Sequence, residues 1–385
     1  MNPKLNDFLN PRIAKHLASD FSVEESCIIV SPGIVAENIK IFKDSLPSVG
    51  IFYAYKCFPD PKIIRQIDSV VEGYDVASEQ EIKDLLELGV DGSRMVFSNP
   101  VKIPGHIEFA YNSGVELFVF QSSSELEKIA KYAPGSKVIL RIKVPDTNNV
   151  TGQIFSKKFG SEPQSSISLL LEAKKLNLDP IGITFHVGSQ NEHPDLWHDA
   201  IKLCGDIIDQ CRQAGVNISL LDIGGGFPSN YSANDFGLFY DIANTINRAL
   251  SLYIKDDIKI IAEPGRFLVA DSGCLVANVI GREQRSKQEW LFLDVGVFSG
   301  LFEVFEFNRL LQRVEVLVDN KSSYRSNFIL AGPTCDGDDI IATNIELPQD
   351  LEVGDKLVFS KAGAYVVSYS TKFNGMPVPK IVYQD

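Results

Sequence analysis

The chain has few of the features that mark membrane, secreted and nucleic-acid-binding proteins. It has no long uninterrupted apolar run, so no transmembrane helix is expected. Residues 1–7 lack the apolar core of a signal peptide. Lysine and arginine number 37 against 50 aspartates and glutamates, and the net charge of -13 argues against nucleic acid or an anionic membrane as partner. We therefore expect a cytoplasmic protein whose partner is a small molecule, with no nucleic acid and no membrane.

Cysteine and histidine are also scarce. The six cysteines are scattered without a C-x-x-C pair, and the five histidines show no H-E-x-x-H spacing. Without a secretion signal, the cysteines are expected to be reduced thiols rather than disulfides or zinc ligands. The sequence therefore predicts no metal site.

The hydrophobic residues that are present predict a barrel. They make up 44% of 385 residues, enough for two domains or for one barrel with an addition. Candidate strands are expected at 51–55, 73–77, 95–98, 117–120, 138–143, 182–186, 220–223 and 258–262. Helix-like segments lie between them, for example 80–88, 123–132, 166–175, 194–214 and 232–252. This alternation predicts an α/β fold, a (β/α)8 TIM barrel, with a doubly wound open sheet as the alternative.

Strands dominate the sequence after about residue 270. They are expected at 275–280, 289–293, 313–317, 327–331, 356–359 and 364–367. This pattern predicts a second, mostly β domain, and an early strand at 27–30 is expected to join it. The predicted division is an N-terminal segment, 1–30, a barrel, 31–270, and a C-terminal β domain, 271–385.

Lys56 is the residue whose place in the sequence suggests chemistry. It ends the apolar run 51–55 and precedes Cys57. A buried ammonium is costly unless it is paired or neutralised, so such a lysine either reaches solvent or serves a reaction. Burial lowers the pKa of a lysine, which suits an amine that forms Schiff bases with carbonyl compounds. In a barrel, Lys56 would follow the first strand at the carboxyl end, where active-site groups gather.

Other chemically active residues follow the later strands. They are Asp75, Glu81, Arg141, His186, Ser189, Gly224, Gly225, Gly226, Glu263, Gly265 and Arg266. Glycines let backbone N–H groups approach an anion closely, and Ser189 and Arg266 would add donors. Barrels often bind phosphate near their last strands, so these loops predict a phosphate site, with plain turns as the alternative.

His186 and Glu263 would complete a site for an aromatic cofactor. An imidazole beside Lys56 can stack on a ring, and a buried acid can pair with the protonated pyridine nitrogen of pyridoxal phosphate (PLP). Arg141 would hold such acids ionised or contact the cofactor. A satisfied strand-end histidine and ordinary salt bridges remain open as alternatives.

The β region carries further candidates. Cys335 and Asp336 lie in a turn marked by Pro and Gly, where the thiol could donate a proton and the carboxylate could bind a cationic group. Tyr365 could give its phenol to a phosphate or be an ordinary strand aromatic.

Taken together and in this order, the motifs resemble the ornithine/lysine/diaminopimelate decarboxylases, PLP enzymes of alanine-racemase-like fold. The resemblance runs from about residue 21 to 382, and the stretch 294–301 is most similar to bacterial ornithine/lysine decarboxylases. It implies a barrel with a C-terminal β domain. It also implies a carboxy-lyase that converts a basic L-amino acid, ornithine or lysine, to a diamine, as in polyamine biosynthesis.

The resemblance assigns a role to each motif. Lys56 would form the Schiff base with PLP, His186 would stack on the ring, and Glu263 would pair with its nitrogen. The residues implied around the rest of the cofactor are Ser189, Gly225, Gly226, Gly265, Arg266 and Tyr365 at the phosphate, with Asp75, Glu81 and Arg141 nearby. Cys335 would protonate the α-carbon. Asp336 would bind the distal ammonium of the substrate near Tyr365, and both residues of this turn would come from the other subunit of a homodimer.

The sequence departs from the family at a second acid. Glu306 aligns where an aspartate is usual, and whether Glu303 or Glu306 faces the substrate is open. One extra methylene moves a carboxylate by roughly 1 Å, which favours a shorter or differently placed substrate. Diaminopimelate, diaminobutyrate or a conjugated diamino acid stays an alternative, although Asp336 argues against diaminopimelate. A non-catalytic regulator like the antizyme inhibitors is the alternative of another class, and the retained Lys56 argues against it.

Overall fold

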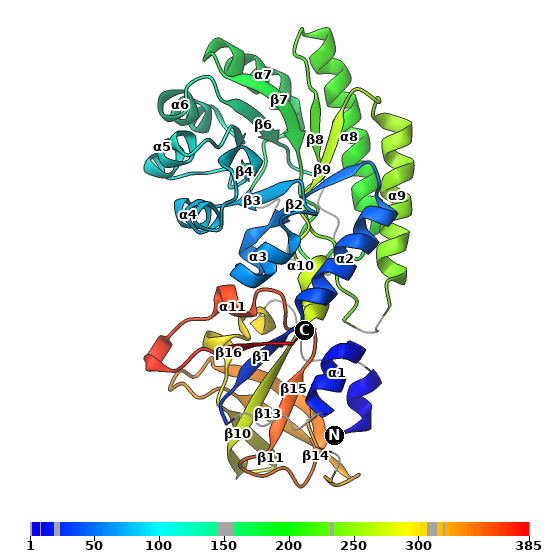
Figure 1. Ribbon diagram of the computed structural model, residues 1–385, viewed down its shortest axis with the longest axis vertical. Helices are drawn as coiled ribbons and strands as arrows, with labels where there is room; N and C mark the ends of the chain where they lie inside the picture. Colours follow the sequence, from blue (N-terminus) through cyan, green and yellow to red (C-terminus); the bar gives the residue numbers. More distant parts are fainter. Residues whose placement is uncertain are drawn as a thin grey trace.

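Eight parallel strands close into a barrel in chain order, and the (β/α)8 prediction is confirmed (Figure 1). The computed structural model describes residues 2–7, 9–18, 24–144, 158–231, 235–305, 314–318 and 320–384. The barrel strands are β2 (Val49–Ala54), β3 (Gly73–Val76), β4 (Met95–Phe97), β5 (Leu117–Phe120), β6 (Lys137–Arg141), β7 (Asp179–Thr184), β8 (Leu220–Asp222) and β9 (Lys259–Ala262). Because β2 pairs with both β3 and β9, the ring has no edge, and the open-sheet alternative is wrong.

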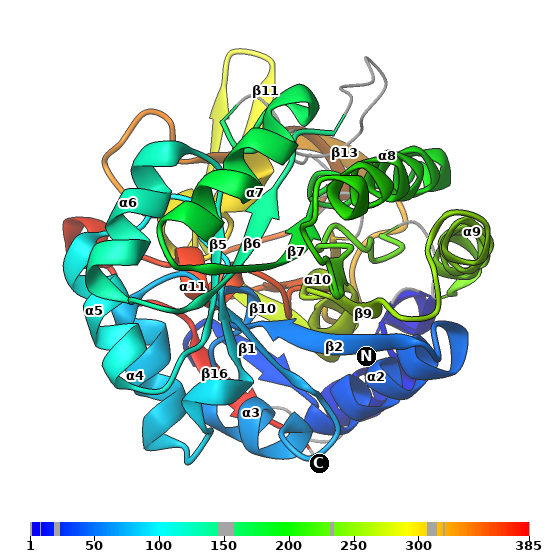
Figure 2. The same ribbon diagram turned by 90° about the horizontal axis from the view of Figure 1, so that it is seen from above.

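Helices cover the outside of the barrel, as the view from above shows (Figure 2). They are α2 (Pro32–Ser45), α3 (Pro61–Ile67), α4 (Glu79–Glu87), α5 (Pro104–Asn112), α6 (Ser123–Tyr132), α7 (Ser166–Lys175), α8 (Pro194–Gln213) and α9 (Gly237–Tyr253). The short helix α10 (Arg266–Val269) lies below the barrel, toward the sheet (Figure 1). Capping side chains stabilise the first turn of several of these helices. The carboxylate of Asp60, for instance, accepts hydrogen bonds from the backbone N–H groups of Lys62 (2.9 Å) and Ile63 (3.1 Å) at the start of α3. Within the described ranges, no helix combines the length and the apolar character needed to cross a membrane.

The two faces of the barrel strands contribute to two separate hydrophobic clusters. The inner cluster is made of Phe52, Val96, Val119, Ile139, Leu220 and Ile261. Strand neighbours such as Tyr53 and Phe97 belong instead to the main core beneath the helices. Successive side chains of a strand point to opposite faces, and both faces are buried here, which is why the sequence shows short continuous apolar runs.

The second part of the fold is an eight-stranded sheet below the barrel (Figure 1). Its strands are β1 (Cys27–Val30), β10 (Gly273–Arg285), β11 (Gln288–Leu293), β12 (Val314–Val316), β13 (Arg325–Ala331), β14 (Ile340–Pro348), β15 (Lys356–Phe359) and β16 (Lys380–Tyr383). β1 lies between β10, which it pairs antiparallel, and β16, which it pairs parallel. The predicted mostly-β region that includes the early strand is therefore present, while the residue limits 1–30, 31–270 and 271–385 stay a prediction.

The strand predicted at 364–367 is wrong. Tyr365 has φ 63° in the left-handed region, which ends any strand, and the short helix α11 (Val366–Tyr369) follows it. The backbone N–H of Tyr365 donates a hydrogen bond to the carbonyl of Cys57, 2.8 Å away in the barrel. A contact between distant parts of the chain thus decides this local conformation.

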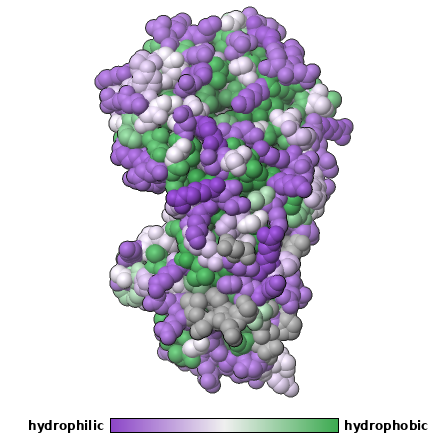
Figure 3. All heavy atoms as spheres, viewed as in Figure 1, coloured by the Kyte–Doolittle hydropathy of each residue, from purple (hydrophilic) through white to green (hydrophobic). Residues whose placement is uncertain are grey.

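The barrel and the sheet meet at a narrow middle. Ser31 N donates to the carbonyl of Ser272 (2.8 Å), and α2 and α10 lie at this junction in Figure 1. The space-filling view shows a notch in the outline between the two parts, on the side where Figure 1 labels α11 (Figure 3). This arrangement brings α11 close to the carboxyl ends of the barrel strands.

Candidate active site

Two adjoining cavities lie at the carboxyl ends of the barrel strands. The larger, about 240 Å³, is bordered by Lys56, Asp75, Ala77, Ser98, Asn99, Pro100, Arg141, Phe159, His186, Ser189, Glu263, Glu303, Tyr365 and Tyr369. The smaller, about 50 Å³, is bordered by Ala54, Lys56, Asp75, His186, Ser189, Gln190, Gly225, Gly226, Phe227, Glu263, Gly265, Arg266 and Tyr365. The candidates predicted on the barrel therefore gather at one place, together with Tyr365 from the β region. Glu81 lies just behind this wall and bonds the backbone N–H of Ala77.

Lys56 lies in a short 3-10 turn (Tyr55–Cys57) directly after β2 and forms an ion pair with Asp75 of β3. Its side chain is 45% accessible because it borders the cavity. Burial alone would lower the pKa of Lys56, yet the carboxylates of Asp75, Glu263 and Glu81 together raise it well above the usual range. The expectation of a lowered pKa is therefore wrong for the chain by itself, because the sequence did not show three acids around one amine.

Glu81 stands in the first turn of α4, beneath Lys56. Burial raises the pKa of Glu81 to about 7, although the backbone N–H of Ala77 and the charge of Lys56 act in the opposite direction. Asp75 and Asp84 add to the increase. This carboxyl therefore changes charge near neutral pH, within the range in which the site would operate.

We expect Glu81 to make folding stability depend on pH. Between its usual pKa of 4.5 and its raised pKa of about 7, the folded chain holds a proton that the unfolded chain has lost. The free energy of unfolding should therefore fall as pH rises through this window. Glu81→Gln should remove about 3 kcal/mol of that fall, measured by urea unfolding at a series of pH values.

The control for this prediction is Glu127→Gln, a change at an exposed position of α6. That variant should keep the pH slope of the parent protein. An unchanged slope in Glu81→Gln itself would show that the carboxyl ionises normally in the folded chain.

Glu263 follows β9 and lies in a network of buried polar groups. Ser98 Oγ donates a hydrogen bond to its carboxylate. Asp222, which accepts from Thr184 Oγ (2.9 Å) and Gly224 N (2.9 Å), lies beside it. Burial and the charges of Asp222 and Asp75 raise the pKa of Glu263 well above its usual value. Burial and these neighbouring charges therefore favour the protonated form of Glu263.

His186 and Arg141 also border the larger cavity. Burial lowers the pKa of His186 well below its usual value, and the cations Arg141 and Lys56 lower it further. Its Nδ1 accepts a hydrogen bond from Gly188 N (2.9 Å), which requires this nitrogen to be unprotonated. The guanidinium of Arg141 lies 5.1 Å from the centre of the Phe159 ring. The imidazole ring of His186 is therefore neutral, and the bond from Gly188 fixes its orientation.

The glycines of the smaller cavity are required by close approach. Gly226 has φ 100°, and a Cβ there would lie 2.3 Å from the carbonyl oxygen of Gly188. A Cβ at Gly265 would lie 2.9 Å from Cβ of Cys57. These glycines leave room for an anion beside Arg266, whose terminal nitrogens reach Tyr231 Oη (2.9 Å) and Ser189 Oγ (3.3 Å). We call Ser189, Gly225, Gly226, Gly265, Arg266 and Tyr365 the anion cradle.

Of the two glutamates that the sequence left open, Glu303 is the one that the structure describes, and it lies at the site. It stands in a short 3-10 helix, η7 (Phe302–Phe305), is buried, and forms a two-pronged ion pair with Arg266, one bond being 2.8 Å. Glu306 lies outside the described residues, so its predicted role is not tested. The sequence left the choice between these two glutamates open, and Glu303 borders the larger cavity.

Cys335 and Asp336 lie apart from the cavity. Both are exposed, and neither is among the described residues that border it. The backbone N–H of Cys335 (3.1 Å) and its thiol (3.2 Å) both donate to Oδ1 of Asn374. Asp339 fixes the turn from beneath, because it accepts from Val297 N (2.7 Å) and Thr334 N (3.0 Å). One chain therefore does not bring its own Cys335 to its own Lys56.

Several residues of the site were missed by the sequence reasoning. They are Ser98, Phe159, Asp222 and Tyr369. Ser98 and Asp222 could have been found, because each stands at or near the carboxyl end of a predicted strand. Phe159 and Tyr369 carry no such signal, because segments outside the regular barrel pattern bring them to the cavity.

The chemical groups that border the cavities fit PLP. An amine, a buried acid and an anion cradle lie around one cavity, as an aldehyde, a pyridine nitrogen and a phosphate require. Oδ1 of Asp75 is buried and has no hydrogen-bond partner within the described residues, so a cofactor donor could satisfy it. The individual roles predicted from the sequence remain predictions.

Comparison with known proteins gives the family. Residues 33–270 match the model of the pyridoxal-dependent decarboxylase, pyridoxal binding domain. Ornithine decarboxylase of Schizosaccharomyces pombe is 37% identical over 349 residues, which are 88% of this chain and 79% of that protein. Lysine/ornithine decarboxylase of Selenomonas ruminantium is 33% identical over 377 residues, 97% of this chain and 92% of that protein.

The solved structures agree with this family. The arginine decarboxylase of Paramecium bursaria Chlorella virus, bound to agmatine, superposes with a TM-score of 0.88 at 32% identity, over 97% of this chain and 99% of that one. The family model covers the barrel, whereas the match to the viral structure covers both the barrel and the sheet. The chain therefore belongs to the PLP-dependent ornithine/lysine decarboxylase family of alanine-racemase-like fold, and it is a PLP-dependent decarboxylase.

Proposed function

We propose that the chain decarboxylates a basic L-amino acid, ornithine or lysine, to a diamine, as in polyamine biosynthesis. The observation that carries this proposal is the acid lining of the cavity that holds Lys56. Glu303 adds a carboxylate to Asp75 and Glu263 on its border. Asp75 now pairs with Lys56, and Glu303 pairs with Arg266. A bound cofactor would engage Lys56 and Arg266, and the carboxylates left beside them would favour a substrate with a second positive charge.

The residues of the barrel would divide the work. Bound PLP supplies a pyridinium ring that accepts the electron pair left when the substrate loses CO2. Lys56 would hold the cofactor through its amine, and Asp75, its ion-pair partner, is placed to take the proton that this amine must lose. Glu263 would pair with the ring nitrogen and favour its protonation, and the neutral plane of His186 would pack on the ring. Arg141 lies beside these groups.

The anion cradle would hold the phosphate. Arg266 uses its terminal N–H groups on Glu303, Tyr231 and Ser189. The bond to Ser189 is the longest of those given, at 3.3 Å, so it is the one that a phosphate oxygen would most easily replace. Ser189 and Arg266 would then both donate to the phosphate, while Glu303 keeps the guanidinium in place.

Cys335 and Asp336 would serve the site of a second subunit. Cys335 would protonate the α-carbon after CO2 leaves, and Asp336 would bind the distal ammonium, together with Glu303 or Glu306 and near Tyr365. Exposed aromatic side chains support a homodimer interface close to these residues, namely Phe305, Tyr369 and Phe373. All six cysteines are free, which supports a cytoplasmic location.

A substrate panel tests the proposal. Ornithine, lysine, arginine, diaminobutyrate and diaminopimelate would be compared by CO2 release, with arginine included because of the viral relative. We expect the highest kcat/KM for ornithine or lysine. Diaminopimelate should be at least about tenfold poorer, because its distal carboxylate would face the acid lining.

Two results would contradict this assignment. A preference for diaminopimelate would show that the lining does not select for positive charge. Failure to release CO2 from every substrate, with no cofactor bound, would favour the non-catalytic regulator.

A further inference from the structure

We propose that Lys361, a residue of the sheet region, positions the anion cradle through Asp271 and Ser229 and so sets the affinity for the phosphate group of the cofactor. The inference rests on the proposed function in one respect, namely that the cradle takes a phosphate. Lys361 does not border either cavity, so it would be a positioning residue and not a catalytic one.

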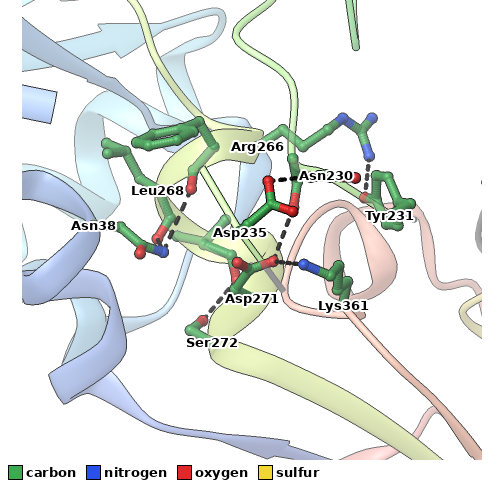
Figure 4. Close-up of polar contacts among 12 residues, drawn as sticks. Asn38, Asn230, Tyr231, Asp235, Arg266, Leu268, Asp271, Ser272 and Lys361 are labelled. Carbon is green, nitrogen blue, oxygen red and sulfur yellow. Dashed lines mark hydrogen bonds and ion pairs between the residues drawn. The ribbon is translucent and has the colours of Figure 1, made fainter. Parts of the chain in front are cut away.

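Both the side chain and the backbone of Lys361 are in energetically unfavourable environments. Its side chain is 3% exposed, and its backbone has φ 52° in the left-handed region. Its Nζ lies 2.8 Å from Oδ1 of Asp271, and Figure 4 shows this ion pair. A buried ammonium and a left-handed backbone each cost free energy, so a surrounding structure must hold them in place.

Asp271 connects Lys361 to the barrel. It lies in the 3-10 turn Ala270–Ser272 that follows α10, the helix that begins at Arg266. The same Oδ1 also accepts a hydrogen bond from Ser229 Oγ, at 2.8 Å. One carboxylate oxygen therefore joins the segment after β15 to the loop that follows Gly226.

Ser229 in turn fixes two loops of the cradle against each other. Its backbone N–H donates to Oε1 of Gln190 (3.1 Å), and its carbonyl accepts from Nε2 of the same amide (2.7 Å). Gln190 is 1% exposed and directly follows Ser189. Asn191 N also donates to the carbonyl of Gly226 (2.9 Å). The loops of Ser189 and Gly226 are thus joined directly by Asn191 and also through Ser229, which Asp271 connects to Lys361.

The groups expected around the cofactor ring are held by other contacts. Lys56 pairs with Asp75, Glu263 is bonded by Ser98, and His186 by Gly188. Loss of Lys361 should therefore disturb the phosphate end and leave the ring end in place. A ligand with a phosphate and the same ligand without one should separate the two ends.

The experiment compares Lys361→Met with the parent protein, each freed of cofactor, by titration with PLP, pyridoxal and inorganic phosphate. We expect PLP and inorganic phosphate to bind about tenfold more weakly to the variant. Pyridoxal, which lacks the phosphate, should bind within about twofold of the parent. Loss of folding alone would not change the ratio of the two cofactor affinities.

Ser229→Ala keeps the test decisive if Lys361→Met fails to fold, because it removes only one hydroxyl of the same connection. It should weaken PLP more than pyridoxal, and the double variant should be no weaker than the poorer single one. Lys380→Met, at an exposed lysine of β16, is the control and should bind PLP as the parent does. An unchanged ratio of PLP to pyridoxal affinity in Ser229→Ala would overturn the proposal. Equal affinity of the parent for both ligands would instead contradict the phosphate role of the cradle itself.

Discussion

Lys56→Ala is expected to abolish the visible absorption band of the attached cofactor and to reduce CO2 release by on the order of a thousandfold or more. Lys56 is the amine that borders both cavities, and it pairs with Asp75. Without it, none of the described residues that border the two cavities offers a primary amine to the cofactor aldehyde. The measurement is the absorption spectrum after extensive dialysis, followed by release of CO2 from ornithine and lysine.

The control is Lys83→Ala, which removes an exposed lysine of α4 that pairs with Glu79. This variant should keep both the band and the activity. A band that survives dialysis in Lys56→Ala would show that another amine attaches the cofactor.

Lys102 is the amine that would be chosen from its pKa alone. Burial lowers the pKa of Lys102 to about 8, whereas that of Lys56 is raised. Lys102 Nζ nevertheless bonds the carbonyl of Val119 and the carboxylate of Glu125 (3.2 Å), and it does not border either cavity. Access to the cavity, and not the ease of deprotonation, therefore selects the reactive lysine.

Mixing inactive Lys56→Ala protein with Cys335→Ala protein is expected to restore activity. If each site takes Lys56 from one subunit and Cys335 from its partner, a mixed dimer contains one site with both residues intact. Free exchange at equal amounts would then return about a quarter of the parent activity, since half of the dimers are mixed and half of their sites are complete. The measurement is CO2 release against the mixing ratio, after subunit exchange has been verified.

Lys56→Ala mixed with Glu263→Gln is the matched control. Both residues border the same cavity of one chain, so no mixed dimer gains a complete site. Recovery in this control would point to a contaminating activity. Absence of recovery in the first mixture would contradict the shared site and leave Cys335 without its assigned role.

Much of the barrel could be predicted because its rules are local. Alternating strands and helices, and polar residues directly after the strands, are visible in the sequence. A barrel then brings those residues to one end whatever their distance along the chain. This explains why Lys56, His186 and Glu263 were predicted together from three different loops.

The remainder depended on contacts between distant segments. Tyr365 was placed in a strand because its neighbours are apolar and β-branched, but its bond to Cys57 belongs to the junction of the two parts of the fold. The pKa of Lys56 was predicted in the wrong direction for a similar reason. Its sequence neighbours are apolar, and the acids that surround it come from β3, α4 and the end of β9.

The position of β1 between β10 and β16 has a consequence for synthesis of the chain. β1 is made early, but the strands on both of its sides are made only after the whole barrel. An apolar strand with unpaired backbone groups must therefore wait while the ribosome completes the rest. We expect β1 to be an aggregation-prone segment during translation and the sheet to assemble last, after the barrel has already closed.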